Sequence, residues 1–164
     1  MRHLKTFEKH RPTAPISLLI DAWKKDKGYI SDILNVAKDE GITAEAYIQE
    51  NDGQLRIQIY NNKEADNFND ICHDIVSRIE MLPHEITEIK LKRNRSGILR
   101  HFKARDIIIK DVKEIYDHEI IDFTITIKNQ IDVDMRRHIT NNFSPEEVNI
   151  YDKWDKKYSK GDSH

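Results

Sequence analysis

An alternating apolar pattern over residues 42–60 constrains the fold of this chain more than any other feature. Ile or Ala occupies every second position in residues 42–48, and Leu or Ile does the same in residues 55–59. A two-residue period places alternate side chains on opposite faces of a β-strand, so each run predicts a strand with one apolar face. Asn51, Asp52 and Gly53 separate the runs, and Asp-Gly supplies the positive φ that a tight turn requires. Residues 42–60 are therefore predicted to form a β-hairpin.

Apolar residues elsewhere recur at spacings of three and four, which predicts helices. One stripe follows Pro15 and includes Leu19 and Trp23, with Gly28 interrupting the pattern. A second runs over residues 30–37 and ends at Gly41 as a helix C-cap. A third covers residues 63–82, has an acidic opposite face and stops at Pro83. Near the C-terminus we expect a short helix around residues 135–143, followed by an aromatic helical stripe over residues 148–158.

The remaining periodic segments predict further strands. Residues 87–92 alternate as one strand, and residues 106–116 and 119–128 are expected to form a second hairpin that turns at Asp117-His118. A chain of 164 residues suits one domain with a real core. We therefore predict a single α+β domain whose mostly antiparallel sheet, two hairpins plus one strand, packs against helices. Its expected divisions are an N-terminal arm (1–14), the domain (15–160) and a C-terminal tail (161–164).

The single cysteine and the distribution of apolar residues predict the setting of the protein. Cys72 has no partner for an internal disulfide, which indicates a reducing, cytoplasmic location. No apolar run approaches the roughly 18 residues of a membrane span, so we expect no membrane partner.

The first residues, MRHLKTFE, resemble the opening of small accessory proteins of tailed bacteriophages. A composition rich in Ile, Asn, Lys and Asp also suits the AT-rich genomes of such phages. The resemblance covers this stretch alone and brings no catalytic residues with it. It implies a phage-type accessory protein that acts in the host cytoplasm.

The strongest electrostatic feature is a basic segment, residues 90–105. It contains seven Lys or Arg and no Asp or Glu, although the whole chain carries a net charge of −2. Cations gathered in this way neutralise phosphates, and the release of counterions then drives binding to nucleic acid. We therefore predict a nucleic-acid-binding site made of Lys90, Lys92, Arg93, Arg95, Arg100, Lys103 and Arg105.

Two other interpretations of the basic segment stay open at this point. Its cations could bind an acidic protein surface. In another alternative the protein is an interaction module that modulates a host or virion protein through its N-terminal arm or its aromatic C-terminal stripe. The cations of the basic segment could also pair within the chain, because residues 63–89 hold seven acidic and two basic residues. The predicted acidic helix over residues 63–82 would supply the partners.

Enzymatic motifs are scarce, so we expect a non-catalytic protein without cofactor or bound metal. The sequence contains no Gly-rich phosphate loop, CxxC, HExxH or GxSxG motif. The enzymatic alternative is a metal-dependent nuclease, in which carboxylates hold Mg²⁺ and a lysine orients the water or the phosphate. Glu88 and Lys90 form a Glu-x-Lys pattern on a predicted strand, and Asp111 or Asp122 would face it from another strand.

Overall fold

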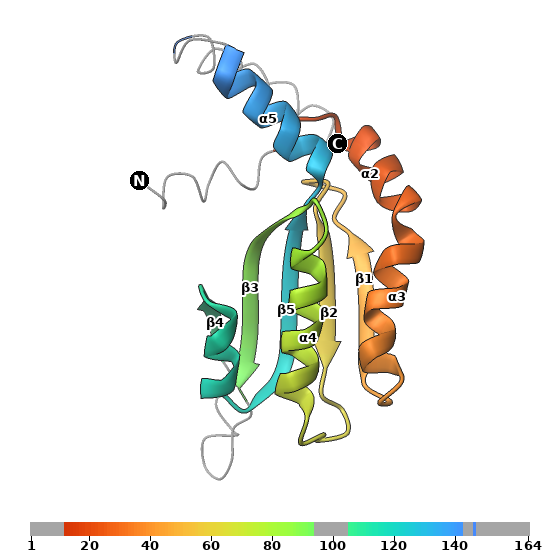
Figure 1. Ribbon diagram of the computed structural model, residues 1–164, viewed down its shortest axis with the longest axis vertical. Coiled ribbons are helices and arrows are strands. Elements are labelled where there is room, and N and C mark those ends of the chain that lie inside the picture. Colours follow the sequence, from red (N-terminus) through yellow and green to blue (C-terminus); the bar gives the residue numbers. More distant parts are fainter. Residues whose placement is uncertain (1–11, 94–104, 143–145, 147–164) are drawn as a thin grey trace.

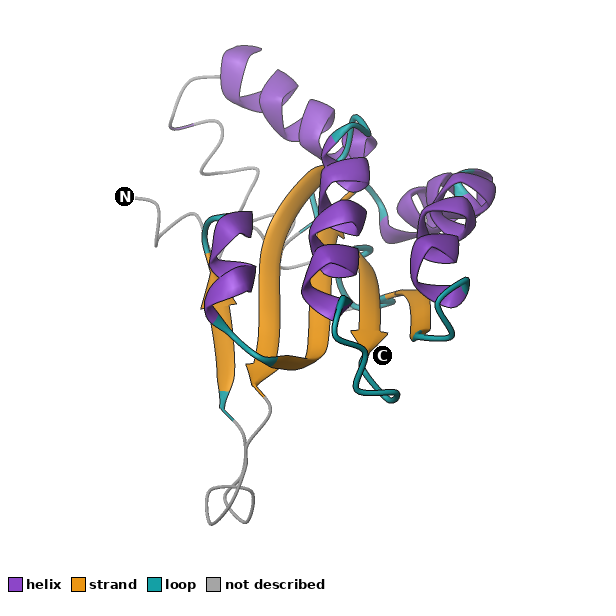
Figure 2. Ribbon diagram, turned by 60° about the horizontal axis from the view of Figure 1, so that its bottom comes forward, coloured by secondary structure: helices purple, strands orange, loops and turns teal. Residues whose placement is uncertain are grey.

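In the described part of the chain, five antiparallel strands form one sheet, and helices pack on one of its faces (Figures 1 and 2). The computed structural model describes residues 12–93, 105–142 and 146. The strands, in the spatial order β1-β2-β5-β3-β4, are β1 (Thr43–Ile48), β2 (Leu55–Tyr60), β3 (Glu85–Arg93), β4 (Asp106–Ile109) and β5 (Ile120–Lys128). The helices are α2 (Ile16–Lys25), α3 (Lys27–Lys38), α4 (Phe68–Glu80), α5 (Gln130–Asn142) and the 3-10 helix η2 (Val112–Asp117). The predicted α+β fold class is confirmed. None of the helices in these described ranges is long and apolar enough to cross a membrane.

The β1–β2 hairpin is confirmed, with Ala46 opposite Ile57. Its loop is closed by the Gln49 N–H, which donates to the Gln54 carbonyl at 2.8 Å. Gly53 in this loop has φ +69, a conformation that costs a glycine little. A Cβ at Gly53 would also lie 2.5 Å from Cδ1 of Leu19. Both the backbone and the packing therefore require glycine at this position.

The predicted second hairpin is wrong in its pairing. Residues 106–116 do not form one strand, because β4 ends at Ile109 and η2 follows. Asp111 accepts a hydrogen bond from the Lys113 N–H, and Glu114 accepts one from the Asp111 N–H, which together make a capping box that starts η2. β4 pairs with β3, and β5 lies between β2 and β3. Apolar alternation identified β5 but carries no information about its neighbours.

Helix α3 follows its predicted apolar stripe. Gly41 has φ +73 and the Ile42 N–H donates to the Ala37 carbonyl, which is the predicted C-terminal cap. Gly28 does not interrupt the helix, because the break between α2 and α3 falls at Asp26. The side chains that α3 buries are Ile30, Ile33, Leu34 and Ala37.

Helix α4 is shorter than the predicted 63–82. Asn61 Oδ1 accepts a hydrogen bond from the Ala65 N–H at 2.9 Å, and Glu64 has φ 51. These features hold residues 61–66 in a loop, and the helix begins only at Phe68. Cys72 is buried on the apolar side of α4, and burial raises the pKa of its thiol. The thiol is therefore protonated and unreactive at neutral pH.

The end of the predicted N-terminal arm packs against α5. The N–H groups of Thr13 and Ala14 donate to the Asp132 carboxylate, the second at 2.7 Å. Lys128 Nζ lies 3.6 Å from the other oxygen of Asp132. Asp132 is 2% exposed, so three partners surround a buried carboxylate.

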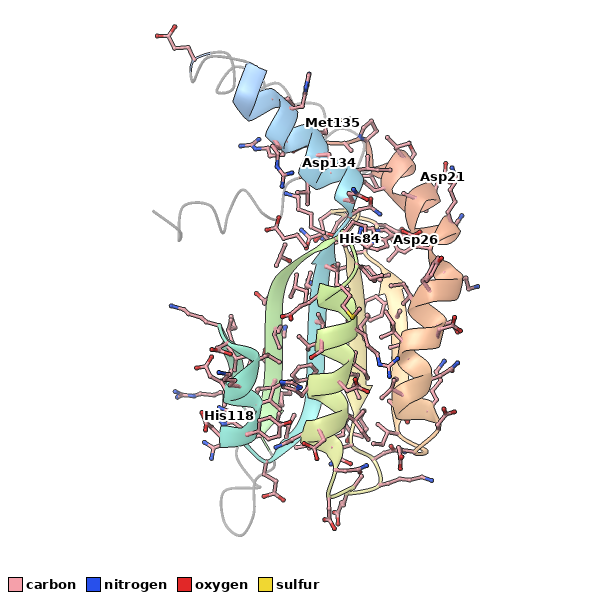
Figure 3. All side chains as sticks on the ribbon, in the orientation of Figure 1. Asp21, Asp26, His84, His118, Asp134 and Met135 are labelled. Atoms are coloured by element: carbon pink, nitrogen blue, oxygen red, sulfur yellow. The ribbon has the colours of Figure 1, made fainter. Side chains whose placement is uncertain are left out.

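His84 joins the α2–α3 pair to α5 at the same end of the sheet (Figure 3). Its Nδ1 accepts a hydrogen bond from the Gln130 N–H at 2.9 Å, and its Nε2 lies 3.1 Å from Asp26 Oδ2. Because Nδ1 accepts, Nε2 carries the proton and donates to Asp26. The ring packs 4.6 Å from that of Trp23. We call Trp23, Asp26, His84, Gln130 and Asp132 the α5 junction.

Several predicted features lie outside the described residues. They are the aromatic stripe over residues 148–158 and the tail 161–164.

Candidate nucleic-acid interface

The two faces of the sheet differ in chemistry. One face carries the core residues, among them Ile57, Phe123 and Ile125, and packs against α4 and its neighbouring helices. None of the described helices packs on the opposite face (Figure 2). We call this second surface the polar face. Its members are Thr43, Glu45, Tyr47, Arg56, Gln58, Tyr60, Glu88, Lys90, Lys92, Asp106, Ile108, Asp122, Thr124 and Thr126.

Strand register brings distant parts of the sequence together on the polar face. Gln58 of β2 lies opposite Thr124 of β5, and Thr124 lies opposite Lys90 of β3. In the next row, Asp122 lies opposite Lys92. The first hairpin and the basic segment therefore share one surface, with only β5 between them.

A shallow hollow of about 170 Å³ lies at the centre of this surface. Arg56, Lys90 and Lys92 line it from two strands. Nε of Arg56 is buried and has no hydrogen-bond partner in the described part of the chain. A buried donor without an acceptor is costly. The positive charges of Arg56 and both lysines would stabilise an anionic oxygen in the hollow.

Two carboxylates, Asp106 and Asp122, line the hollow beside the three cations, so its net charge is +1. Asp122 accepts from Nε2 of Gln58 at 3.2 Å. Asp106 lies 3.9 Å from the ammonium groups of both Lys90 and Lys92, whose side chains are 31% and 45% exposed. Ion pairs this long and this exposed contribute little to stability. Both lysines thus stay available to a phosphate.

The predicted site residues fall into two groups. Lys90 and Lys92 point onto the polar face, while Arg93 and Arg105 are exposed at the end of the β3–β4 pair. The structure therefore brings these four cations to one end of the sheet. Arg95, Arg100 and Lys103 lie outside the described residues.

Helix α4 does not neutralise the lysines of the polar face. It packs on the apolar face, so the sheet separates its acidic side chains from Lys90 and Lys92. Asp74 pairs with Arg78 of the same helix at 3.2 Å. Asp70 accepts from the Tyr116 hydroxyl at 2.9 Å. Intramolecular pairing with α4 therefore does not apply to these two lysines.

The carboxylates of the nuclease alternative are not gathered into a metal site. Glu88 lies opposite Thr126, and Asp122 is on the same strand as Thr126 but about 13 Å farther along it, at ~3.3 Å per residue. Metal ligands must lie within about 2.0–2.6 Å of one ion, so these two carboxylates do not share one. Asp111 caps η2 and lies away from the polar face. Across the described ranges, no three His, Cys, Asp or Glu side chains are grouped to hold a metal ion.

Reasoning from the sequence missed the contribution of the first hairpin. Tyr47, Arg56 and Tyr60 were recognisable only as the polar side of a predicted hairpin. Their alternation with apolar residues predicted the side of the strand on which they lie, but not which strands lie next to them. Their position on the same face as Lys90 depends on β5 pairing with both β2 and β3, which local periodicity does not encode.

No protein-family model, curated protein or solved structure matches this chain. The polar face is therefore interpreted from its own chemistry.

Proposed function

We propose that this protein is a small accessory protein that binds single-stranded nucleic acid on its polar face without altering it chemically. The observation that carries this proposal is the hollow that Arg56, Lys90 and Lys92 line from two strands. A phosphate oxygen would accept from Arg56, and its charge would be balanced by the lysines. Arg93 and Arg105 would extend contact along the backbone toward the end of the β3–β4 pair.

Two exposed tyrosines favour single strands over duplexes. Tyr47 and Tyr60 are 42% and 43% exposed on neighbouring strands of the polar face. Aromatic rings on a sheet offer stacking surfaces to unpaired bases, at about 1–3 kcal/mol per base. A paired duplex hides the base faces and could use only the cations.

Because the chain as a whole is slightly acidic, its affinity for nucleic acid has to come from a limited set of residues. Its isoelectric point near 6.4 gives no general attraction to polyanions, so affinity must come from the polar face and the adjacent arginines. Salt sensitivity should therefore be moderate and should depend on few residues.

Fluorescence anisotropy with labelled oligo(dT) and oligo(U) tests the proposal. Binding should weaken as salt rises from about 50 to 200 mM, and the double variant Lys90→Gln/Lys92→Gln should lower the slope of log affinity against log salt by about 0.7 for each lost phosphate contact. The matched control is Lys25→Gln/Lys113→Gln, which removes the same charge from exposed positions on α2 and η2.

Three results would overturn the proposal. The parent protein could show no binding, or both double variants could weaken binding equally. Cleavage of the oligonucleotide that depends on added Mg²⁺ would instead support the nuclease alternative. A melting curve on each variant ensures that lost binding is not lost folding.

A further inference from the structure

One edge of β1 presents backbone groups that no described strand uses. Within the described residues, β1 pairs with β2 on one side only. Because the Gln49 N–H donates to the Gln54 carbonyl, the alternation of an antiparallel ladder directs the N–H and C=O groups of Ala46 away from β2. The same holds for Ala44 and Ile48, two residues away on either side. A row of such groups is a template on which another strand can add.

A groove of about 460 Å³ lies along this edge, between β1 and the α2–α3 pair. Figure 1 shows α3 beside β1, running antiparallel to it. Two alanines on the strand make the space, because strands more often carry the larger β-branched and aromatic residues. The apolar side chains that line the groove are Trp23, Ile30, Leu34, Ala44, Ala46 and Ile48.

Lysines line the groove at both of its ends. Lys24 and Lys27 lie where α2 meets α3, and Lys38 lies at the last turn of α3. Because α3 and β1 run in opposite directions, the first two flank the end of β1 and the third flanks its beginning. All three lysines are exposed. The acidic residue that lines the groove, Glu45, belongs to the polar face on the other side of the strand.

We propose that this groove binds an extended acidic peptide, which adds to β1 as a sixth strand. Main-chain hydrogen bonds to Ala44, Ala46 and Ile48 would supply affinity, as in other strand additions. Apolar side chains in the middle of the peptide would contact Ile30 and Leu34. Acidic residues at its two ends would meet the lysines, so the groove selects a segment that is acidic, then apolar, then acidic.

Charge argues against a second copy of this chain as the occupant. Pairing β1 with β1 would bring two lysine-lined grooves together, and like charges placed so close are repulsive. The lysines thus protect the edge from self-association, as charged residues on edge strands do. They also admit a partner of opposite charge.

Three labelled peptides test the chemistry of the groove by fluorescence anisotropy. EEVTVTVEE combines acidic ends with an apolar alternating centre and should bind. KKVTVTVKK reverses the charges, and EEGGSGGEE keeps the acidic ends without the apolar centre, so both should bind at least tenfold more weakly. If EEGGSGGEE bound as tightly as EEVTVTVEE, charge alone would account for the binding, and the proposal would be overturned.

Charge-reversal variants of the protein test whether the peptide binds at the groove. Lys24→Glu/Lys27→Glu/Lys38→Glu should weaken EEVTVTVEE at least tenfold, whereas Lys25→Glu/Lys110→Glu/Lys113→Glu, with the same change in net charge outside the groove, should not. Lys90→Gln/Lys92→Gln should also leave peptide binding unchanged. If that last variant lost the peptide, the basic segment and not the groove would be its site.

Amide hydrogen exchange tests the strand addition itself. Saturating EEVTVTVEE should slow exchange at Ala44, Ala46 and Ile48, whose N–H groups face the free edge, more than at Glu45 and Tyr47, which already bond to β2. Two further peptides carry methyl groups on alternate backbone nitrogens of EEVTVTVEE, one on the odd positions and the other on the even positions. The peptide whose methyl groups replace the N–H groups that face β1 should fail to bind, and the other should still bind. Binding without edge protection, or a dimer in sedimentation that the peptide does not dissociate, would overturn the proposal.

Discussion

The α5 junction and the polar face both hold charged side chains, yet their partners differ. At the junction, the buried Asp132 carboxylate contacts two backbone N–H groups and Lys128. On the polar face, Lys90 and Lys92 share Asp106 at 3.9 Å, and Nε of Arg56 is buried without a partner among the described groups. The Asp132 carboxylate thus has three partners, while Arg56 Nε on the polar face has none among the described groups.

This difference separates a structural role from a binding role. A buried charge with several partners holds elements together. Removing one member of such a group leaves the other polar groups buried without a partner. Exposed cations with a weak partner add little to folding, so Lys90 and Lys92 are available to an anion from outside. Stability and binding should therefore respond to different mutations.

The largest effect is expected at Asp132. Asp132→Ala should lower the free energy of unfolding by about 3–5 kcal/mol, because Lys128 and the two N–H groups lose a buried partner. Urea denaturation measures the change. Asp134→Ala, at an exposed position on the same helix, is the matched control and should stay within about 0.5 kcal/mol. Similar losses in both variants would contradict the role assigned to the junction.

A pH-dependent effect is expected at His84. Burial lowers the pKa of this imidazole from its ordinary value of 6.5, and the hydrogen bond to Asp26 opposes the shift in part. A group whose pKa is lower in the folded state contributes stability that is complete above pH ~6.5 and is lost as pH falls through the folded value. Protonation of Nδ1 would also break the bond from Gln130.

Unfolding curves recorded over a range of pH measure this contribution. The parent protein should lose stability as pH falls below 6.5, and His84→Gln should show a shallower dependence. Parallel pH profiles for the two proteins would show that His84 does not titrate on unfolding.

A smaller effect is expected at Arg56. Arg56→Met keeps much of the aliphatic stem and removes a buried donor that has no acceptor, so stability should be unchanged or slightly higher. Oligonucleotide affinity should fall in the same variant. A clear loss of stability would mean that Arg56 serves the fold, and the distinction between the two regions would weaken.

The smallest effect on stability is expected for Lys90→Gln/Lys92→Gln. The ion pairs with Asp106 are long and partly exposed, so thermal and urea denaturation should place this variant within about 0.5 kcal/mol of the parent protein. Its loss of nucleic-acid binding would then be a loss of contacts. Marked destabilisation would instead assign these lysines to the fold.

Much of the fold was predictable because its signals are local. The alternation over residues 42–60 identified β1 and β2, and stripes at spacings of three and four identified α3 and α4. The error at residues 106–116 has a local cause as well. Asp111 and Glu114 form a capping box, which ended the strand although apolar residues continued beyond it.

The candidate site was predictable only in part. Charge density alone selected Lys90, Lys92, Arg93 and Arg105, whereas Arg56 and the two tyrosines carried no such signal. In the nuclease alternative, Glu88 and Asp122 were correctly placed on the same face. Their separation along the strands followed from the register, which the sequence pattern did not contain.

The order of residues determined which segments form strands and helices and which side of each is apolar, since both follow from the geometry of neighbouring residues along the chain. Tertiary structure decided that β5 lies between β2 and β3, which sets Arg56 and Lys90 around one hollow and leaves β1 at the edge beside α3. Strand pairing joins residues far apart in sequence, and its free energy depends on how whole surfaces pack. The hollow of the polar face and the edge groove exist only after that assembly.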